Sequence, residues 1–250
     1  MLYGMYLSAT GMAMNQSQQD VIANNLANVD TAGFKRDLSI FKQRLQEAKG
    51  INGQFLPANL KEATGGAFAA NVQTDYTQGG VEHTNRNLDL AIEGPGFLTV
   101  QDGETTRYTR DGRLGLADGK LVRQIDGKPL LDDAGKEIVL PSDTTARDIR
   151  IDSQGNVWDK TSQVGKLGVV TFDQPRNLVK IGGNLFDAMG QDAEKIDPQI
   201  DSGTIETSTV NPASEMVEMI KTSRSFQMNA AMITLQDQSL AKLVSELPKL

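Results

Sequence analysis

The sequence predicts an α+β fold, in which paired N- and C-terminal helices form a coiled-coil-like core and a mostly antiparallel β domain lies between them in the chain. Two observations support this fold class. Apolar residues recur at helical spacing at both ends, and short β-prone runs separated by Asp-Gly pairs fill the middle. We expect a terminal helical domain at 1–35 and 205–250, extended connectors at 36–80 and 190–204, and the β domain at 81–189.

The N-terminal helix is predicted to run from Leu2 to about Val29. Apart from tyrosine, the only ionisable side chains among the first 34 residues are Asp20 and Asp30. A helix on a protein surface normally carries more charge, so we expect this one to be enclosed. Its apolar stripe is thin, rich in methionine and partly polar, and consists of Met5, Ala9, Met12, Gln19, Ile22, Leu26 and Val29.

The C-terminal helix has a well-marked start, because Asn211 can cap it and Pro212 suits the first helical position. Its predicted seam follows a heptad pattern and consists of Met216, Met219, Ser223, Phe226, Ala230, Ile233, Asp237, Leu240, Val244 and Leu247. Most helix stability comes from packing, so each terminal helix needs a partner. We expect the two helices to pair, and the apolar surface left over to contact other copies of the chain.

The middle of the chain alternates short strands with turns. The predicted turns are Asp102-Gly103, Asp111-Gly112, Asp118-Gly119, Asp126-Gly127, Ala134-Gly135 and Gln154-Gly155. The predicted strands are Leu88–Ile92, Phe97–Val100, Arg107–Thr109, Lys120–Arg123, Ile138–Leu140, Ile149–Ile151, Val157–Trp158, Leu167–Phe172 and Leu185–Ala188. This spacing is typical of a compact antiparallel barrel or sandwich.

Composition narrows the range of functions. The chain has 250 residues, a net charge of -7 and no cysteine, which excludes a disulfide framework, a thiolate zinc site and a cysteine nucleophile. Its basic residues are scattered, which argues against nucleic acid as a partner. The apolar run from Leu2 to Met14 is interrupted by small and polar residues, so we expect no membrane-spanning helix. The first basic residue is Lys35, so we also expect no cleaved signal peptide.

Enzyme signatures are absent from the sequence. The sole histidine, His83, lies in a polar, connector-like stretch, and there is no Gly-x-Ser-x-Gly, His-Glu-x-x-His or P-loop motif. The Gly94-Pro95-Gly96 run reads as a turn that opens onto a strand. We therefore expect no enzymatic activity, no catalytic residue, no cofactor and no metal site.

Three segments resemble the flagellar basal-body rod and hook family of bacterial axial proteins. The first, ANNLANVDTAGFKR at Ala23–Arg36, is similar to the N-terminal signature of that family. The second, NLDLAIEGPGFLTV at Asn87–Val100, is similar to the strand pair that opens its middle domain. The third, Gly203–Leu240, resembles its C-terminal helix and the approach to that helix. The three matches occur in the family's order and cover both ends and the middle of the chain.

The resemblance implies a structural subunit of the flagellar rod, either proximal or distal. It further implies export through the flagellar type III route and assembly in the periplasm into a helical tube that transmits motor torque to the hook. In such a tube the terminal helices form the inner core. The implied partners are other copies of the chain, other rod proteins, the hook protein, the surrounding ring proteins and the export apparatus.

The assembly residues that we expect lie on the terminal helices and just after the first of them. They are Met12, Ile22, Asn24, Asn25, Leu26, Asn28, Phe34, Met216, Ile220, Phe226, Ile233 and Leu240. Amide side chains can bridge neighbouring helices where a buried charge would be costly. Gly33 is expected to form a turn, after which Phe34 anchors the chain. An ordinary intramolecular core is the competing interpretation of the same apolar residues.

A second function remains open at this point. The chain could be a secreted β-rich binding or cell-wall-cleaving module that its helices oligomerise. The sequence has 32 acidic residues, and nothing in it marks a pair of them for sugar hydrolysis. Deletion of the last helix separates the two hypotheses, because it should abolish assembly and motility for a rod subunit and leave binding or hydrolysis intact for a module.

Overall fold

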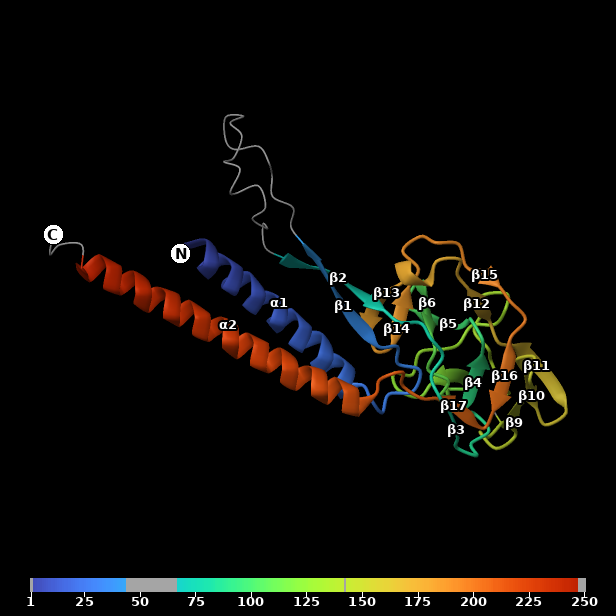
Figure 1. The fold of residues 1–250 in the computed structure, drawn as a ribbon. Coiled ribbons are helices and arrows are strands. Elements are labelled where there is room, and N and C mark those ends of the chain that lie inside the picture. The colour runs from blue at the N-terminus through green and yellow to red at the C-terminus, as the bar shows by residue number, and fades with distance from the viewer. Residues whose placement is uncertain (1, 44–66, 142, 247–250) are drawn as a thin grey trace. The chain divides into compact units, whose positions relative to one another are not determined.

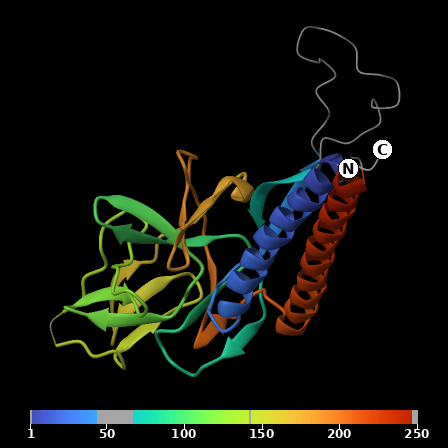
Figure 2. The same ribbon diagram turned by 90° about the vertical axis from the view of Figure 1, so that its left-hand side faces the viewer.

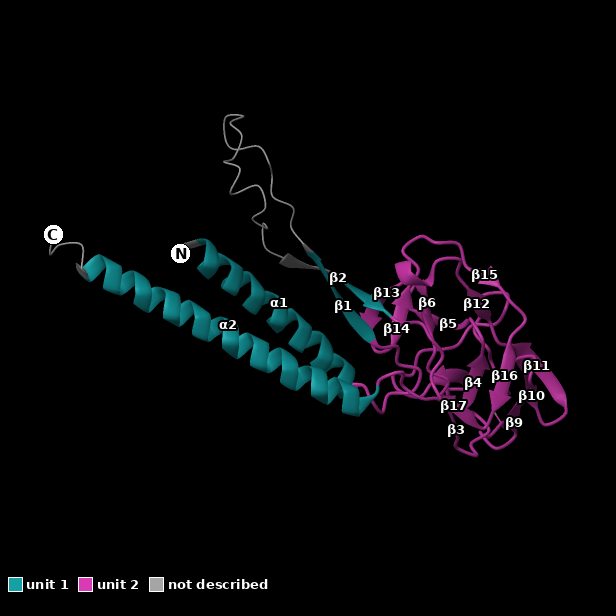
Figure 3. Ribbon diagram, in the orientation of Figure 1, with its two compact units in different colours: residues 1–27, 37–74, 211–250 teal, residues 28–36, 75–210 magenta. Residues whose placement is uncertain are grey.

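A computed structural model describes residues 2–43, 67–141 and 143–246 of the chain (Figure 1). The chain divides into two compact units, coloured separately in Figure 3. Unit 1 consists of residues 1–27, 37–74 and 211–250, and unit 2 of residues 28–36 and 75–210. Two long helices and a central antiparallel β domain confirm the predicted α+β class.

Unit 1 contains the two helices, α1 at Leu2–Ala27 and α2 at Pro212–Glu246. They run antiparallel and side by side in both views (Figures 1 and 2). The predicted cap is present, since the backbone N–H of Ser214 donates to Oδ1 of Asn211 at 3.2 Å. The predicted seam residue Leu247 lies outside the described residues.

A β-hairpin completes unit 1. Strand β1, Asp37–Gln43, pairs antiparallel with β2, Ala67–Thr74, and both strands contact α1. The described parts of 36–80 therefore contain paired strands where the sequence predicted an extended connector, and 44–66 lie outside the described residues. The pattern was hard to find because a bulge between Ile40 and Phe41 breaks the alternation of β1, and the two strands are far apart in the sequence.

Unit 2 holds the remaining strands and one short 3-10 helix, η2 at Pro175–Asn177. The strands are β3 Val81–His83, β4 Leu90–Glu93, β5 Phe97–Asp102, β6 Thr105–Thr109, β7 Leu114–Ala117, β8 Lys120–Arg123, β9 Ile149–Ile151, β10 Asn156–Asp159, β11 Ser162–Lys166, β12 Val169–Thr171, β13 Val179–Gly182, β14 Leu185–Asp187, β15 Glu194–Lys195, β16 Gln199–Ser202 and β17 Thr204–Glu206.

These strands form several small antiparallel sheets. The largest has the order β13-β14-β6-β5-β12-β15, a second has the order β11-β10-β9, and the pairs β16-β4, β17-β3 and β7-β8 complete the unit. Because β16 pairs with β4 and β15 with β12, the range 190–204 also contains paired strands where the sequence predicted a connector. The predicted strand Ile138–Leu140 is wrong in detail, since the chain there forms only isolated bridges.

Two apolar clusters form the core of unit 2. The larger is aliphatic and includes Leu98, Leu121 and Ile149, all of which are buried. The smaller is aromatic, with the rings of Phe97 and Phe186 at a centroid distance of 5.6 Å. Aromatic rings in this edge-to-face arrangement add to the stabilisation that burial alone provides.

Most of the predicted Gly-containing turns are confirmed by positive φ angles at Gly103, Gly119, Gly127, Gly135 and Gly155. The prediction of a turn at Asp111-Gly112 is wrong. A Cβ atom on Gly112 would lie 1.7 Å from the carbonyl oxygen of Leu90, so glycine is required there because two backbone segments approach closely.

Candidate assembly site

The two helices of unit 1 approach closely because α1 carries glycine where α2 carries long amides. A Cβ atom on Gly4 would lie 2.7 Å from Nε2 of Gln236, and one on Gly11 would lie 2.9 Å from Nδ2 of Asn229. Glycine in a helix interior lowers the stability of the helix by about 1 kcal/mol relative to alanine. At these two positions its lack of a side chain allows the helices to come close together. The sequence analysis did not identify this pairing.

The expected assembly residues of unit 1 fall into two groups. On α1, Ile22 and Asn25 are buried, Met12 and Leu26 are half-buried, and Asn24 is exposed. On α2, the half-buried members are Phe226, Ile233 and Leu240. The two others on α2, Met216 and Ile220, are 52% and 54% exposed. The described chain thus encloses part of the predicted set and leaves Met216 and Ile220 facing solvent.

A second apolar face of α2 is exposed. We call it the outer stripe, and it consists of Val217, Ile220, Met228, Met232, Leu235 and Leu243. At about 100° per residue, these positions fall within a sector of about 140° whose centre points away from Glu215, and Asn229 and Gln236, which meet α1, lie just beyond one edge of that sector. The exposed basic residues Lys221, Arg224 and Lys242 fall within the same sector, so apolar and basic side chains share this side of the helix. Exposed apolar side chains gathered on one side of a helix form a candidate interaction surface.

Asn25 joins three elements of unit 1. Its Oδ1 accepts the backbone N–H of Asp37 at 2.9 Å, and its Nδ2 donates to the carbonyl oxygen of Asp37 at 2.8 Å. The same Nδ2 lies 3.4 Å from Oε2 of Glu215, whose side chain is buried at the start of α2. The amide therefore connects α1, β1 and α2, and the sequence analysis missed its partners.

The second half of the signature belongs to unit 2. Oδ1 of Asn28 accepts the hydroxyl of Thr31 at 3.2 Å, which closes a polar turn after α1. Gly33 follows with a φ of 66°, and a Cβ atom there would lie 2.3 Å from the carbonyl oxygen of Arg110. Glycine is therefore needed at this position both for its backbone conformation and for space.

Phe34 is buried in unit 2, where Nζ of Lys180 lies 4.1 Å from the centroid of its ring. The same ammonium group donates a hydrogen bond to the carbonyl oxygen of Lys35. A cation over an aromatic face is attracted by the electrons of the ring. Contacts within the described chain thus hold Phe34 in place.

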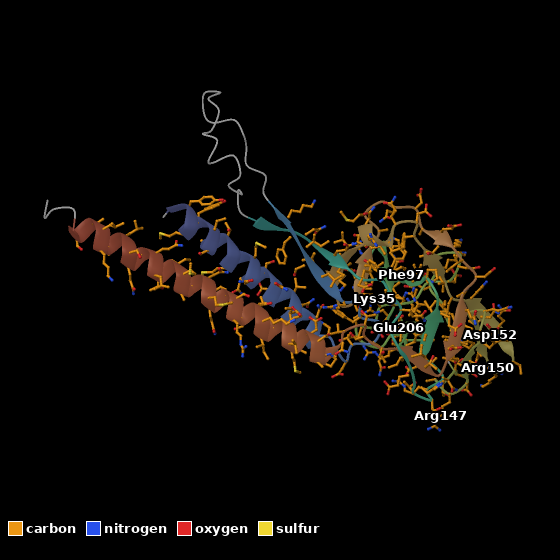
Figure 4. The ribbon with its side chains drawn as sticks, viewed as in Figure 1. Lys35, Phe97, Arg147, Arg150, Asp152 and Glu206 are labelled. Carbon is orange, nitrogen blue, oxygen red and sulfur yellow. The ribbon has the colours of Figure 1, made fainter. Side chains whose placement is uncertain are left out.

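Lys35 and Glu206 form a buried ion pair in unit 2, with Nζ and Oε1 2.5 Å apart and both side chains 1% exposed (Figure 4). Nζ also donates to the carbonyl oxygen of Thr77 at 2.7 Å. Oε2 of Glu206 lies 3.5 Å from Nη1 of Arg110, and Oε1 accepts the backbone N–H of Gly79 at 2.8 Å. Buried charges persist when they are paired and hydrogen-bonded in this way.

Burial dominates the electrostatics of this cluster. It lowers the pKa of Lys35 below its usual value, and the neighbouring carboxylate of Glu206 opposes that change. Burial likewise lowers the pKa of Arg110, again against the influence of Glu206. Removing either cation would leave the buried carboxylate of Glu206 without one of the two positive charges that stabilise it.

Backbone hydrogen bonds align the segment after α1 with the segment before α2. The N–H of Gly33 donates to the carbonyl oxygen of Glu206 at 2.7 Å, and the N–H of Thr209 donates to that of Phe34 at 3.0 Å. The N–H of Arg36 donates to Oγ1 of Thr209 at 2.8 Å.

The sequence pattern does not mark Lys35, Arg110, Glu206 or Glu215 as site residues. Lys35 and Glu206 are 171 residues apart, and nothing local indicates that their side chains meet. Both lie inside segments whose family resemblance was noted, which is the one signal that could have drawn attention to them.

Among the described residues, neither helix is long and apolar enough to cross a membrane. Within the same residues, no group of three or more His, Cys, Asp or Glu side chains could hold a metal ion.

Comparison with known protein families gives three matches. The family described as "Flagella basal body rod protein" matches residues 5–35. The family "Flagellar hook protein FlgE/F/G D1 domain" matches 91–158, and "Flagellar basal body rod FlgEFG protein C-terminal" matches 201–246. The first and third matches cover most of α1 and α2, and the second lies within unit 2.

Full-length relatives agree with these matches. The chain is 33% identical to the flagellar basal-body rod protein FlgG of Bacillus subtilis, over 98% of this chain and 99% of the relative. It is 34% identical to FlgG of Buchnera aphidicola subsp. Schizaphis graminum, over 97% and 99%. It is 33% identical to the flagellar basal-body rod protein FlgF of Caulobacter vibrioides, over 92% and 91%.

Proposed function

The chain belongs to the flagellar basal-body rod protein family and is a structural rod subunit, and on that premise we propose that it assembles with further copies of itself through the outer stripe of α2. The observation that carries this proposal is the second apolar face of α2. Ile220 and Leu235 are 54% and 57% exposed on a helix whose opposite side already packs on α1.

The geometry of α2 favours an open assembly. One side of the helix is used within the chain, and the other is free to meet a different surface on the next copy. Contacts between unlike patches do not close on themselves and can propagate as a helical filament. Many such contacts in parallel would transmit torque without any chemical step, so we propose no catalytic activity and no cofactor.

Membership of the family supports a proposal for the wider setting of this subunit. We propose that it lies in the periplasmic part of the rod and is exported by the flagellar type III apparatus. Its further partners in this proposal are other rod proteins, the hook protein and the surrounding rings. One relative, at 28% identity, is named as a flagellar hook-basal body complex protein, which is consistent with contacts along the same axial structure.

Charge introduced into the outer stripe tests the proposal. The variant Ile220→Asp should fold as the parent does, because the side chain is 54% exposed, yet fail to restore swimming to cells that lack the native gene. Ile125→Asp is the matched control, since Ile125 is also 54% exposed but lies in unit 2. Rods should be present in basal bodies purified with the control and missing with Ile220→Asp.

Two results would contradict the proposal. The first is normal rod assembly by Ile220→Asp together with Leu235→Asp, since two charges on one apolar face would then be tolerated. The second is a variant lacking 212–250 that keeps a binding or polysaccharide-cleaving activity of its own. That outcome would favour the secreted β-rich module with helices that only oligomerise it.

A further inference from the structure

The sheet β11-β10-β9 presents one buried and one accessible face. Ile149, Ile151 and Val157 are buried, and they point to the core of unit 2. Side chains alternate along a strand, so Arg150 on β9 and Trp158 on β10 belong to the opposite face. Arg150 is exposed and Trp158 half-buried.

Three side chains form a row across this accessible face. Trp158 is opposite Arg150 in the β9–β10 pairing and opposite Gln163 in the β10–β11 pairing. Trp158 is the only tryptophan of the chain, and both of its cross-strand neighbours are exposed. Tryptophan and arginine are the residue types that contribute most to binding energy at recognition surfaces.

A hydrogen-bond network fixes the orientation of the indole. Nε1 of Trp158 donates to Oδ2 of Asp152 at 3.2 Å, and Nδ2 of Asn156 donates to the same oxygen at 2.8 Å. Nε2 of Gln163 in turn donates to Oδ1 of Asn156 at 3.1 Å. A ring held in this way loses little conformational entropy on binding, because its orientation is already set.

Arg147 and Arg150 lie on or next to this sheet and lack the carboxylate partner that five other arginines of unit 2 have, and in this they resemble Arg176. The side chains of Arg147 and Arg150 make no hydrogen bond or ion pair with any described residue. Figure 4 labels both arginines and Asp152. Five others each have a carboxylate partner: Arg86 with Asp89, Arg107 with Asp187, Arg110 with Glu206, Arg113 with Asp111, and Arg123 with Asp126.

The carboxylates closest in sequence to these two arginines are already engaged. Asp148 accepts the hydroxyl and the backbone N–H of Thr145, and Asp152 accepts from Asn156 and Trp158. In a chain with a net charge of -7, these two exposed guanidinium groups, which have no carboxylate partner among the described residues, are available to a negatively charged ligand. A planar guanidinium is well suited to bind a carboxylate through two parallel hydrogen bonds.

We propose that this face, made of Arg147, Arg150, Asp152, Asn156, Trp158 and Gln163, binds a polysaccharide that carries carboxylate groups. The C–H groups of a sugar ring carry partial positive charge and pack on the electron-rich face of Trp158. Arg150 binds the carboxylate, and the amide of Gln163 both donates to and accepts from hydroxyl groups. An acidic polypeptide could supply carboxylates for the two arginines, but it has no sugar ring to pack on the indole of Trp158.

The single tryptophan provides the readout. The full-length chain is titrated with oligogalacturonate, a carboxylated oligosaccharide, and with neutral maltoheptaose, while the fluorescence of Trp158 is followed. Oligogalacturonate should change the emission in a saturable way, and maltoheptaose should bind at least about tenfold more weakly. The variant Arg150→Gln should weaken oligogalacturonate binding by about tenfold or more.

Matched controls separate a specific site from general attraction between charges. Arg176→Gln removes another exposed arginine, on η2, and should leave the affinity unchanged. Trp158→Phe, followed by calorimetry, should weaken binding while the protein stays folded. No response to oligogalacturonate, equal binding of the neutral oligosaccharide, or an equal effect of Arg176→Gln overturns the proposal. Equally tight binding of polyglutamate overturns it in favour of an acidic protein partner.

Discussion

The side chain of Asn25 forms two reciprocal hydrogen bonds with the backbone of Asp37, accepting from its N–H at 2.9 Å and donating to its carbonyl oxygen at 2.8 Å. Oδ1 of Asp37 accepts the hydroxyl of Thr74, so the chain of contacts continues from β1 to β2. A single amide in the middle of the family signature therefore fixes how the hairpin of unit 1 begins beside α1.

Replacing Asn25 should destabilise unit 1. The variant Asn25→Ala leaves the buried backbone groups of Asp37 without their partners, and such losses cost about 1–3 kcal/mol. Urea denaturation monitored by circular dichroism would measure the difference. Gln16→Ala, at an exposed position of the same helix, should change the free energy of unfolding by less than about 0.5 kcal/mol. Equal stability of the two variants would contradict the role given to Asn25.

Replacing Lys35 should destabilise unit 2. Lys35→Met removes one member of a buried ion pair and leaves the carboxylate of Glu206 without its closest positive charge. In other proteins such a change lowers the free energy of unfolding by about 3–5 kcal/mol. Adding Glu206→Gln should restore part of the loss, because it removes the remaining buried charge. Thermal unfolding of the single and double variants provides the measurement.

Exposed Lys136 supplies the control for this experiment, since Lys136→Met lies in the same unit and leaves no buried charge behind. If the loss of stability in the double variant equals the sum of the losses in Lys35→Met and Glu206→Gln, the two side chains act independently. Such additive losses would contradict the ion pair, which predicts that the double variant loses less than this sum.

The sequence could predict the helices and many of the strands because these depend on local patterns. Asn211 caps α2 as expected, and the strands Lys120–Arg123 and Ile149–Ile151 have the predicted bounds. The pairing of β1 with β2 was missed because the two strands are far apart in the sequence. This pairing depends on contacts with α1 that the local sequence does not encode.

Only some residues of the candidate assembly site could be predicted from local sequence patterns. Periodicity singled out Phe226 and Ile233 on α2, which are half-buried, but it does not tell which apolar residues remain exposed once the helices pair. The ion pair of Lys35 with Glu206 joins residues distant in the chain. Sequence reasoning treats charged residues as solvated by default, so this pair could not be inferred without the tertiary structure.

Gly33 should tolerate no side chain. Gly33→Ala would force a β-carbon to within 2.3 Å of the carbonyl oxygen of Arg110, on a backbone with a φ of 66°. Gly135→Ala is the matched control, because its φ is 79° and nothing lies within 4 Å of the added carbon. The control should lose about 1 kcal/mol from its backbone conformation alone, and Gly33→Ala should lose clearly more. Similar melting temperatures for the two variants would contradict this account.

Acid should release Trp158 from Asp152 at a pH below the usual range for an aspartate. Burial alone would raise the pKa of Asp152, but hydrogen bonds from Asn156, Trp158 and Gln154 outweigh it and lower the pKa below 3.8. Because the folded pKa is below the unfolded one, this carboxylate stabilises the fold above the unfolded pKa. The stabilisation is lost as the pH falls through the folded value.

The fluorescence of Trp158 reports this transition directly, since Nε1 of the indole donates to the carboxylate that titrates. The emission should begin to change at a lower pH than it would for an unperturbed aspartate, while far-ultraviolet circular dichroism reports whether the strands persist. Asp152→Asn keeps an oxygen acceptor that does not titrate, so its emission should be flat over the same range. An identical transition in that variant would assign the change to another carboxyl group or to unfolding of the whole unit.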